Sequence, residues 1–428
     1  MLDRSLEFNK IMEATDRPPT WVNDIRRKAE LILNRVKPRK DRHFDEKKLI
    51  REWFSGKKYK TKGKTVTPNF KPDLDNSINI FIVNGILQEI YDPNRELRNN
   101  NVVVKNLSDV DIEYVEKIKG FIYSSIENDA SLIELYSLLT FNRGIYVHIP
   151  SGVSIGSPIR ILRYYTQGDI EISELNITII GENSYAKLIE EVRDANLYNH
   201  IKVVYNHKIR VGSGSTVKTA YIHNVSSKVN TVNIRKIVAS RYSHIESTYA
   251  WLGGNYNYSE ITNILNGEYS NVNHVEIVFG SNVGKYTLYS SLKHIAQGTH
   301  GRILNRGALK DSARLVYNGL IDIGNEAYKS DALLESHIIL LNRGASAFDV
   351  PGLEIKTNDV RATHSASVSP IDEEQVYYLK TRGLSDDEAR RLIVFGALQP
   401  AIERISSDKV KLAILSRLEE IWGSSMHL

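Results

Sequence analysis

The sequence predicts a mainly β protein whose core is a parallel β-helix with helical segments at both ends. Three observations support this prediction: short β-rich runs follow one another from Gly144, no proline occurs between Pro158 and Pro351, and a loose signature recurs roughly every 27–31 residues. The expected parts are an N-terminal helical and mixed region (1–143), a β-helix core (144–350) and a C-terminal helical domain (351–428).

The N-terminal region combines helices with a β-hairpin. In PPTWVNDIRRKAELILNRV, apolar residues from Trp21 to Ile32 recur at helical spacing. Further along, INIFIVNGILQEI places Asn84 and Gly85 between two apolar runs, and both residue types tolerate the positive φ angles of a two-residue hairpin turn. A strand, NVVVKNL, and a helical stretch that ends near Thr140 complete this region.

The core consists of short runs such as LNITIIG, IKVVYNHKIRV and HVEIVFG, which alternate apolar with polar residues as half-covered strands do. Proline lacks the N–H that a ladder needs, so its absence from residues 159–350 suits a continuously paired sheet. The signature is a turn followed by a small residue and a β-branched run, and it begins near residues 181, 212, 240 and 267. One such unit cannot bury its own inner face, so we expect stacked coils, with an antiparallel sandwich as the alternative.

The C-terminal part is expected to be helical. Ser369 is a candidate N-cap, followed by acidic residues 372–374 at the positive end of the helix dipole, and Gly383 should end this helix. Residues 385–388, SDDE, have capping-box spacing and open a second helix. A third helix with an apolar stripe begins near Ser407.

Composition narrows the classes of function. With 41% hydrophobic and 25% charged residues, no apolar run near 18 residues and a charged start without a signal peptide, we expect a cytoplasmic protein without a membrane span. The chain has no cysteine, so it offers no thiolate nucleophile or sulfur ligand. A basic run at Lys57–Lys64 could meet nucleic acid or acidic lipid, but we expect a solvated loop and no nucleic-acid partner.

The block PGLEIKTNDVRATHSASVSPIDEEQVYYLKTRGLSDDEARRLI, which starts at Pro351, resembles the SufB/SufD family of iron–sulfur cluster assembly scaffolds. It contains a Pro-x-Leu-Glu-Ile strand, a His followed by small residues, a Glu-Gln-x-x-Tyr-Leu helix, and Arg-Gly before an acidic helix start. PPTWVNDIRRKA, IFIVNGIL and FNRGIYVHIPSGVSIGSPIRI resemble the family as well. The resemblance implies a right-handed parallel β-helix, pairing of two related or identical subunits through their β-helices, and a SufC-type ABC ATPase held on the C-terminal helices.

The resemblance also implies site residues. His364 matches a family histidine near the subunit interface, which makes it a candidate iron or cluster ligand that another subunit would have to complete. The alternative is a buried histidine at the corner between the β-helix and the helices. Tyr377, Tyr378, Arg382 and Gly383 match positions that grip the ATPase. For the two tyrosines, packing of the helix onto the β-helix is the alternative.

One departure from the family concerns sulfur. SufB-type members are expected to carry a cysteine that handles sulfur or cluster, and SufD-type members often have one shortly before the histidine, where this chain has Ala362. The cysteine-free chain is therefore identified as SufD-like, and by itself it should hold no cofactor, with iron or a cluster bound only transiently at a subunit interface.

No catalytic constellation is expected. The phosphate-binding Gly-x-x-x-x-Gly-Lys-Ser/Thr loop is missing, so ATP hydrolysis belongs to the partner. Glu190 and Glu191 should point to opposite faces of a strand, and the six-residue spacing of His294 and His300 gives no fixed ligand geometry. We therefore expect a non-catalytic scaffold subunit. The alternative is an intracellular β-helix enzyme that acts on acidic polysaccharide.

Overall fold

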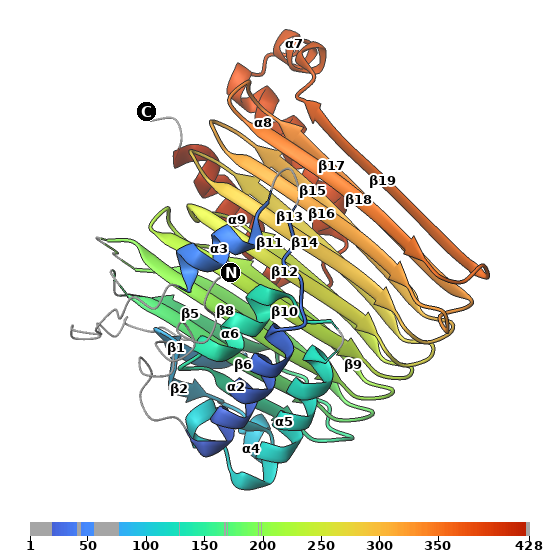
Figure 1. Ribbon diagram of the computed structural model, residues 1–428. Helices are drawn as coiled ribbons and strands as arrows, with labels where there is room; N and C mark the ends of the chain where they lie inside the picture. The colour runs from blue at the N-terminus through green and yellow to red at the C-terminus, as the bar shows by residue number, and fades with distance from the viewer. Residues whose placement is uncertain are drawn as a thin grey trace.

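The computed structural model has a β-helix at its centre and helices on both of its outer faces (Figure 1). It describes residues 19–40, 44–54, 77–127, 129–166, 168, 170–195, 197 and 199–424, so the basic run Lys57–Lys64 lies outside the described residues. The strands form two sheets, one of ten and one of nine strands, and the core of the chain alternates between them. The predicted mainly β fold with a parallel β-helix core is confirmed, and the antiparallel sandwich is wrong.

The two sheets face each other across a lumen, and all pairs are parallel except β1 with β2 and β3 with β4 at the N-terminal end. The ten-stranded sheet has the order β19 (Val360–Pro370), β17 (Ser330–Leu340), β15 (His300–Leu309), β13 (Asn271–Gly280), β11 (His244–Trp251), β9 (Thr216–His223), β7 (Tyr185–Asp194), β5 (Ile159–Tyr165), β1 (Ile78–Val83) and β2 (Ile86–Tyr91). The nine-stranded sheet has the order β18 (Ser346–Ile355), β16 (Arg314–Ile323), β14 (Lys285–His294), β12 (Tyr256–Leu265), β10 (Val229–Ala239), β8 (Ile201–Val211), β6 (Glu171–Ile180), β4 (Ile145–Ile149) and β3 (Val103–Asn106).

The coil length agrees with the predicted repeat. Tyr185 pairs with Thr216, 31 residues further on, and His244 pairs with Asn271, 27 residues further on. The four predicted starts of the repeat lie at one corner of the β-helix, where the chain passes from the nine-stranded sheet to the ten-stranded sheet. At this corner a Cβ added to Gly212 would lie 2.5 Å from the backbone of the preceding coil, so close stacking requires glycine there.

The N-terminal helices cover the outer face of the nine-stranded sheet and share one apolar core with it. The predicted hairpin is confirmed: Asn84 and Gly85 have φ angles of 48° and 80° between β1 and β2. The helices of this region are α2 (Thr20–Leu33), α3 (Glu46–Trp53), α4 (Glu96–Asn99), the 3-10 helix η1 (Leu107–Asp109), α5 (Ile112–Ile126) and α6 (Leu132–Thr140).

The C-terminal helices are α7 (Glu373–Thr381), α8 (Asp386–Glu403) and α9 (Asp408–Ser424). The two longer ones pack on the outer face of the ten-stranded sheet, so the two helical regions lie on opposite faces of the β-helix (Figure 1). The predicted capping box is confirmed, since the Ser385 side chain accepts from the N–H of Glu388 and the Glu388 side chain binds the N–H of Ser385. None of the helices in the described part of the chain is long and apolar enough to cross a membrane.

The first C-terminal helix begins later than predicted. Strands continue beyond residue 351 and form a last coil, β18 and β19, and Asp372 rather than Ser369 is the N-cap. The Asp372 side chain accepts hydrogen bonds from the N–H groups of Glu374 and Gln375. Proline at 351 does not end the β-helix because the strand that contains it is an edge strand, where a missing N–H breaks no ladder.

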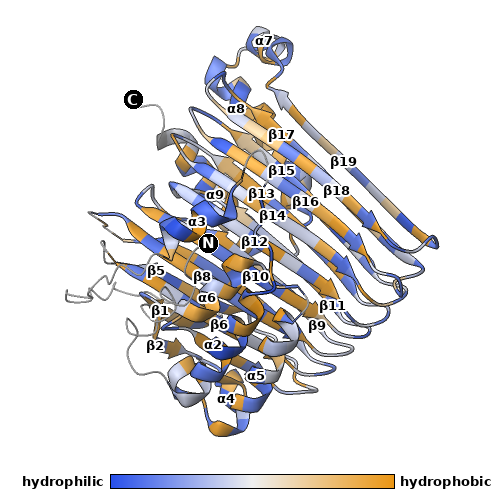
Figure 2. Cartoon of the chain, viewed as in Figure 1, coloured by the Kyte–Doolittle hydropathy of each residue, from blue (hydrophilic) through white to orange (hydrophobic). Residues whose placement is uncertain are grey.

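The lumen has an apolar lining at both corners and a polar middle. Aliphatic side chains fill one corner and aromatic ones, including Tyr205, Tyr221 and Trp251, fill the other. Figure 2 shows how hydrophobic and hydrophilic residues alternate along many of the strands. The inward-facing set therefore fixes which side of each strand belongs to the lumen.

Candidate functional site

The open end of the rod is its last coil, β18 and β19 (Figure 1). Each of these strands has a hydrogen-bonded neighbour on one side and none among the described residues on the other. Four apolar side chains are exposed there: Phe348 at 38%, Val350 at 48%, Ile355 at 46% and Val368 at 37%. Long unpaired edges readily accept a further strand, so this end is a candidate interface.

His364 lies in the middle of β19 and faces the lumen. In register it pairs with Leu334, a fully buried residue of the aliphatic core, and paired residues of parallel strands point to the same face. No described coil lies beyond β19, so the imidazole is exposed. His364 is therefore not the buried corner histidine of the alternative interpretation but a side chain that a second protein can reach.

His364 is not part of a cluster of metal-ligating side chains among the described residues. Among the residues that the structure describes, no group of three or more His, Asp or Glu side chains is placed to hold a metal ion. Ala362, which shares its face of the strand, packs on the aliphatic core. An imidazole in this position could contribute one ligand to iron or to a cluster, and the remaining ligands would have to come from another subunit.

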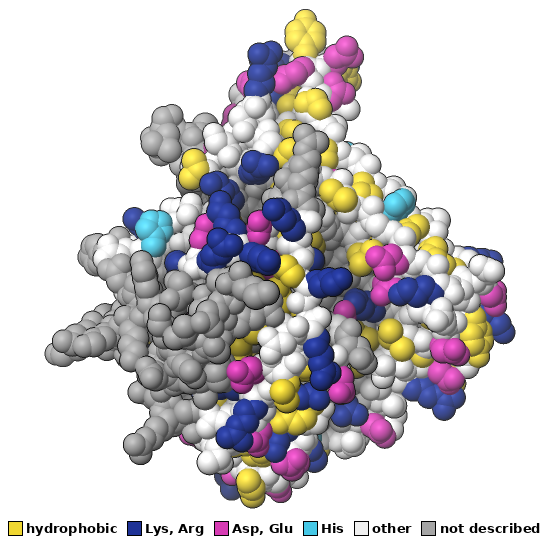
Figure 3. Space-filling model, in the orientation of Figure 1, with side chains coloured by type: hydrophobic (Ala, Val, Ile, Leu, Met, Phe, Trp, Pro, Cys, Tyr) yellow, Lys and Arg dark blue, Asp and Glu magenta, His cyan; other side chains and the backbone are white. Residues whose placement is uncertain are grey.

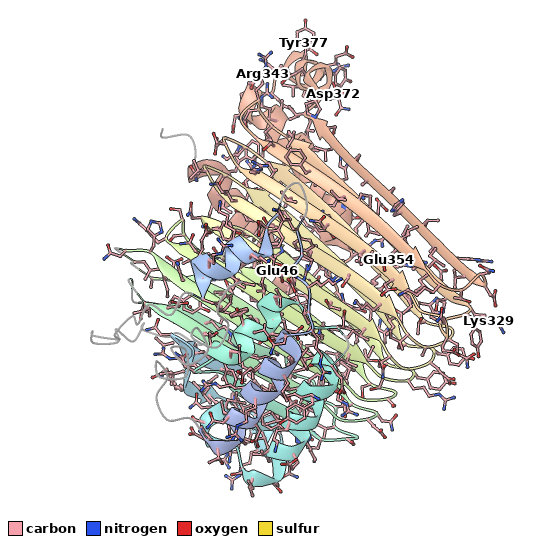
Figure 4. The ribbon with its side chains drawn as sticks, viewed as in Figure 1. Glu46, Lys329, Arg343, Glu354, Asp372 and Tyr377 are labelled. Carbon is pink, nitrogen blue, oxygen red and sulfur yellow. The ribbon has the colours of Figure 1, made fainter. Side chains whose placement is uncertain are left out.

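Helix α7 projects at the same end of the molecule, and Tyr377 lies at its tip (Figure 4). Tyr377 is 70% exposed and Tyr378 is 55% exposed, so neither has the packing role that was the alternative. The Arg382 guanidinium lies 5.1 Å from the Tyr378 ring centroid, and its Nη2 donates to the Tyr378 hydroxyl at 3.2 Å. Gly383 follows with a φ of 95°. The four predicted residues thus lie together, and Figure 3 shows a hydrophobic side chain at this tip beside charged ones.

The inner side of α7 explains why its tyrosines point outward. Val376 is the buried residue of this helix, and it packs with Ile371, Ile339 and Ala389. Arg390 of α8 also donates two hydrogen bonds to a carboxylate in the first turn of α7, at 3.0 and 2.8 Å. The helix is therefore fixed by its inner face, which leaves its outer face available to a partner.

A buried charged network in the lumen is the feature that sequence patterns missed. Arg235 Nη1 donates to Glu190 at 3.0 Å, and His207 Nδ1 lies 3.0 Å from the same carboxylate. One coil earlier Arg163 binds Glu174, and all five side chains are buried. Burial by itself would raise the pKa of Glu190, but Arg235, His207 and Arg163 hold it well below its usual value. The charges compensate one another, as in a structural core rather than a reactive site.

The remaining candidates lie apart. Glu190 and Glu191 point to opposite faces as predicted, since Glu191 faces outward and binds an arginine at 2.6 Å. His294 is buried, its Nδ1 lies 2.8 Å from the Thr299 hydroxyl, and burial lowers its pKa to about 4. His300 is exposed. The two histidines therefore sit in different environments and do not form a ligand pair.

A cleft of about 590 Å³ lies on the outer face of the nine-stranded sheet, between the N-terminal helices and the last strands. Four carboxylates line it, one of them Glu46 (Figure 4). Glu46 accepts from the N–H of Arg39 at 2.6 Å, and Glu260 binds the Arg39 guanidinium at 2.6 Å. Glu134 binds Lys236 at 2.9 Å, and Asp129 forms an ion pair with Lys293. None of these four is free for general acid–base work.

Comparison with known proteins agrees with the fold. Residues 164–397 match the family described as SUF system FeS cluster assembly, SufBD core domain. The chain is 27% identical over 331 residues to the iron–sulfur cluster assembly protein SufD of Bacillus subtilis, covering 76% of this chain and 75% of that one. It is 24% identical over 266 residues to SufB of the same bacterium, covering 60% and 55%. Over 127 residues, 30% of each chain, it is 31% identical to SufD of Escherichia coli. The chain belongs to the SufB/SufD family of SUF iron–sulfur cluster assembly proteins, within which it is SufD-like.

Proposed function

We propose that this chain is a non-catalytic scaffold subunit of a SUF assembly complex. It pairs with a related or identical subunit at the open end of its β-helix and binds a SufC-type ABC ATPase on its C-terminal helices. Family membership supports the assembly role, and the unpaired edges of β18 and β19 are the observation that carries the pairing. Coexpression with the cognate ATPase and a cysteine-bearing paralogue should give an intact complex whose mass contains all three chains. A chain that purifies alone would contradict the proposal.

The ATPase contact is assigned to the exposed side of α7. Aromatic and arginine side chains are common anchors of interface cores, and Tyr377, Tyr378 and Arg382 are clustered there without an inward role. Truncation after Ser369 would also remove α8 and α9, which cover an apolar face of the sheet, so point variants are the sharper test.

The double variant Tyr377→Ala/Tyr378→Ala should lose the ATPase in a pull-down while keeping its thermal unfolding midpoint. A matched control is Tyr242→Ala, because Tyr242 is also exposed, at 56%, but lies at a corner of the β-helix. Loss of binding in the control, or retention in the double variant, would place the contact elsewhere.

His364 is proposed as a ligand of the cargo, iron or a nascent cluster, completed by groups of the paired subunit. Neutral imidazole is a competent iron ligand, and the position of His364 on the exposed last coil supports the role. In the reconstituted complex, His364→Ala should lower bound iron and labile sulfide. His337→Ala is the control, because His337 lies one strand away on the outer face and hydrogen-bonds Ser367. An unchanged cluster yield for His364→Ala would remove the ligand role.

The polysaccharide enzyme is the weaker candidate. Glycoside hydrolysis needs a pair of available carboxyl groups, and the four carboxylates of the cleft are engaged by Arg39, Lys236, Lys293 or backbone N–H. A polyuronate cleavage assay would test it directly, and release of reducing ends by the purified chain would favour the enzyme.

A further inference from the structure

The corner where the chain passes from the nine-stranded to the ten-stranded sheet carries one left-handed residue in each coil. Each of these residues has a positive φ, and its N–H donates to a carbonyl of the next coil: Tyr242 to Glu268 at 3.0 Å and Tyr269 to Gln297 at 3.1 Å. Lys329 marks this corner at the right of Figure 4. This corner ladder consists of Gly152, Asn183, Gly214, Tyr242, Tyr269, Gly298 and Lys329.

Two neighbouring positions of the corner ladder hold tyrosine, which is an unusual residue there. Tyr242 and Tyr269 have φ angles of 55° and 56°. A left-handed backbone is strained for residues with a Cβ, and the coils on either side avoid the strain with Gly214 and Gly298. Bulky residues persist in such a conformation only where their surroundings hold them, and such positions cluster at functional sites.

The two tyrosine rings stack on each other at the surface. Their centroids are 5.3 Å apart, their planes are 9° from parallel, and the residues are 56% and 46% exposed. The Arg241 guanidinium lies 4.8 Å from the Tyr242 ring centroid, and its Nε lies 3.3 Å from a Glu268 carboxylate oxygen. A Cβ added to Gly298 would lie 2.6 Å from the Tyr269 ring, so that ring occupies space that only glycine leaves open. The neighbours of the two rings therefore hold the stack in place.

The other tyrosine–tyrosine contacts in the described part of the chain differ in geometry and in exposure. Their planes are tilted by 34–49°, and each pair includes a buried ring. Tyr258, for example, is fully buried and lies at 49° to Tyr289. The pair formed by Tyr242 and Tyr269 thus combines near-parallel rings with access from solvent.

We propose that Tyr242 and Tyr269 are an oxidative modification site, at which hydrogen peroxide and a haem peroxidase join the two rings as dityrosine. Each phenol gives up one electron and one proton and becomes a phenoxyl radical. The two radicals form a carbon–carbon bond between ring positions ortho to the hydroxyls, and the hydrogen on each of these carbons moves to the phenoxyl oxygen. In sum, two hydrogen atoms leave the pair, and one hydrogen peroxide is reduced to two molecules of water.

The stack favours coupling within one chain. Carbon atoms of stacked rings lie in van der Waals contact, at about 3.5–4 Å, and the exposure of both side chains leaves them room to pivot edge to edge. The chain has no cysteine, so it cannot form a disulfide in response to an oxidant. The new bond would tie two consecutive coils together in the middle of the rod, away from β18 and β19. Because a cross-link restricts the unfolded chain, the oxidised protein should resist unfolding.

Mass spectrometry tests the site directly. The folded protein is treated with hydrogen peroxide and a haem peroxidase, then unfolded and cleaved after lysine, arginine and glutamate. Tyr242 is released in YSHIE (242–246) and Tyr269 in YSNVNHVE (269–276), and each peptide has a single tyrosine. The expected product is these two peptides joined, two hydrogen atoms lighter than their sum, from a chain that stays monomeric on a denaturing gel.

Conservative variants provide the controls. Tyr242→Phe and Tyr269→Phe keep both rings, and each should lose the joined peptide. Tyr328→Phe is the matched control, because Tyr328 is exposed, at 38%, but is not part of the stacked pair, and it should leave the yield unchanged. In urea, oxidised wild type should unfold at a higher midpoint than untreated protein, whereas oxidised Tyr242→Phe should not.

Two results would overturn the proposal. The first is that the joined peptide is missing under conditions that convert free tyrosine to dityrosine. The second is a yield that falls as the protein is diluted, because the coupling would then come from collisions between chains. The outcome is independent of the proposed scaffold function, since the experiment uses the chain without a partner.

Discussion

The two helical covers of the β-helix both pack on it through apolar side chains, but among the described residues only the N-terminal cover adds buried ion pairs. In that cover, buried charge supplements the apolar core shared with the nine-stranded sheet. Lys236 Nζ donates to Glu134 at 2.9 Å and to the Ser125 carbonyl at 2.8 Å, and Lys208 binds the same carboxylate from the neighbouring strand. These side chains are all buried between α5, α6 and the nine-stranded sheet.

The C-terminal cover is attached by apolar packing. Leu398 and Ile414, both fully buried, lie in one cluster with Ile277 and Phe279 of the ten-stranded sheet. Its ion pairs are at the surface, and one of them, between Arg391 and Glu419, has side chains that are 44% and 43% exposed.

The difference in buried charge between the two covers affects how strictly each cover is positioned on the β-helix. Buried ion pairs tolerate few alternative arrangements, because a displaced partner leaves an uncompensated charge. The N-terminal cover is thus set in one position. Apolar packing needs only shape and volume, and it leaves the outward face of the C-terminal cover, with α7, for polar and aromatic groups that a partner can bind.

The largest effect should come from breaking the charged attachment. Glu134→Ala leaves Lys208 and Lys236 buried without their carboxylate and should lower the free energy of unfolding by about 3–5 kcal/mol. Urea unfolding followed by circular dichroism measures it. Glu419→Ala removes the exposed ion pair of the C-terminal cover and should change the free energy of unfolding by less than about 1 kcal/mol. Equal effects would mean that the buried ion pairs of the N-terminal cover contribute no more to stability than the exposed pair of the other cover.

A smaller loss is expected from the apolar attachment. Leu398→Ala removes a fully buried side chain of α8 and should lower the free energy of unfolding by about 2–5 kcal/mol, with little dependence on salt. Leu392→Ala on the same helix is the control, since Leu392 is 55% exposed and its removal should change stability by about 0.5 kcal/mol or less. A salt-sensitive loss in Leu398→Ala would argue against purely apolar packing.

Acid should lower the free energy of unfolding through two buried histidines of the lumen. Burial lowers the pKa of His223 to about 3 and that of His294 to about 4, whereas an unfolded histidine titrates near 6.5. Between about pH 6.5 and 4 the unfolded chain therefore binds protons that the folded chain does not. Stability should fall as the pH falls through this window, by up to about 1.4 kcal/mol per unit for each histidine.

Urea unfolding at pH 7 and pH 5 measures how steeply the free energy of unfolding changes with pH. His223→Phe should flatten it, and His200→Phe, a substitution of an exposed histidine, should leave it unchanged. Equal slopes in the wild type and His223→Phe would show that the folded state takes up the proton.

The smallest expected effect is an increase in the free energy of unfolding. Gly396 lies inside α8, and an added Cβ there would meet no atom within 4 Å. Gly396→Ala should therefore raise the free energy of unfolding by about 0.5–1 kcal/mol. Gly212→Ala, at the crowded corner of the β-helix, should lower it instead. A loss in Gly396→Ala would mean that the outer face of α8 is less open than the structure shows.

Sequence patterns predicted much of the fold and less of the site. The Asn84-Gly85 turn, the capping box at Ser385 and the coil period are confirmed because each depends on residues close together in the chain. The N-cap at Ser369 was wrong, because Asp372 is an equally good cap and the edge position of β19 lets the strand run on through Pro370.

The lumen network could not be predicted in the same way. Glu190 meets Arg235 across two coils, and coil lengths differ by a few residues from one turn of the rod to the next. A slip of one residue would turn either side chain to the other face. Alternating charged residues in neighbouring strands were the available signal, but only the register shows which of them meet.

By itself, then, the sequence determined the local elements, their order and the stacking of coils, since turn chemistry, capping and alternation act over a few residues. The tertiary structure decided which cover lies on which sheet, which charges meet in the lumen, and that His364 faces the lumen at an exposed edge. The physical reason is that these relations depend on the summed lengths of successive coils and on which apolar faces remain to be buried, and neither quantity is written in any short stretch of the chain.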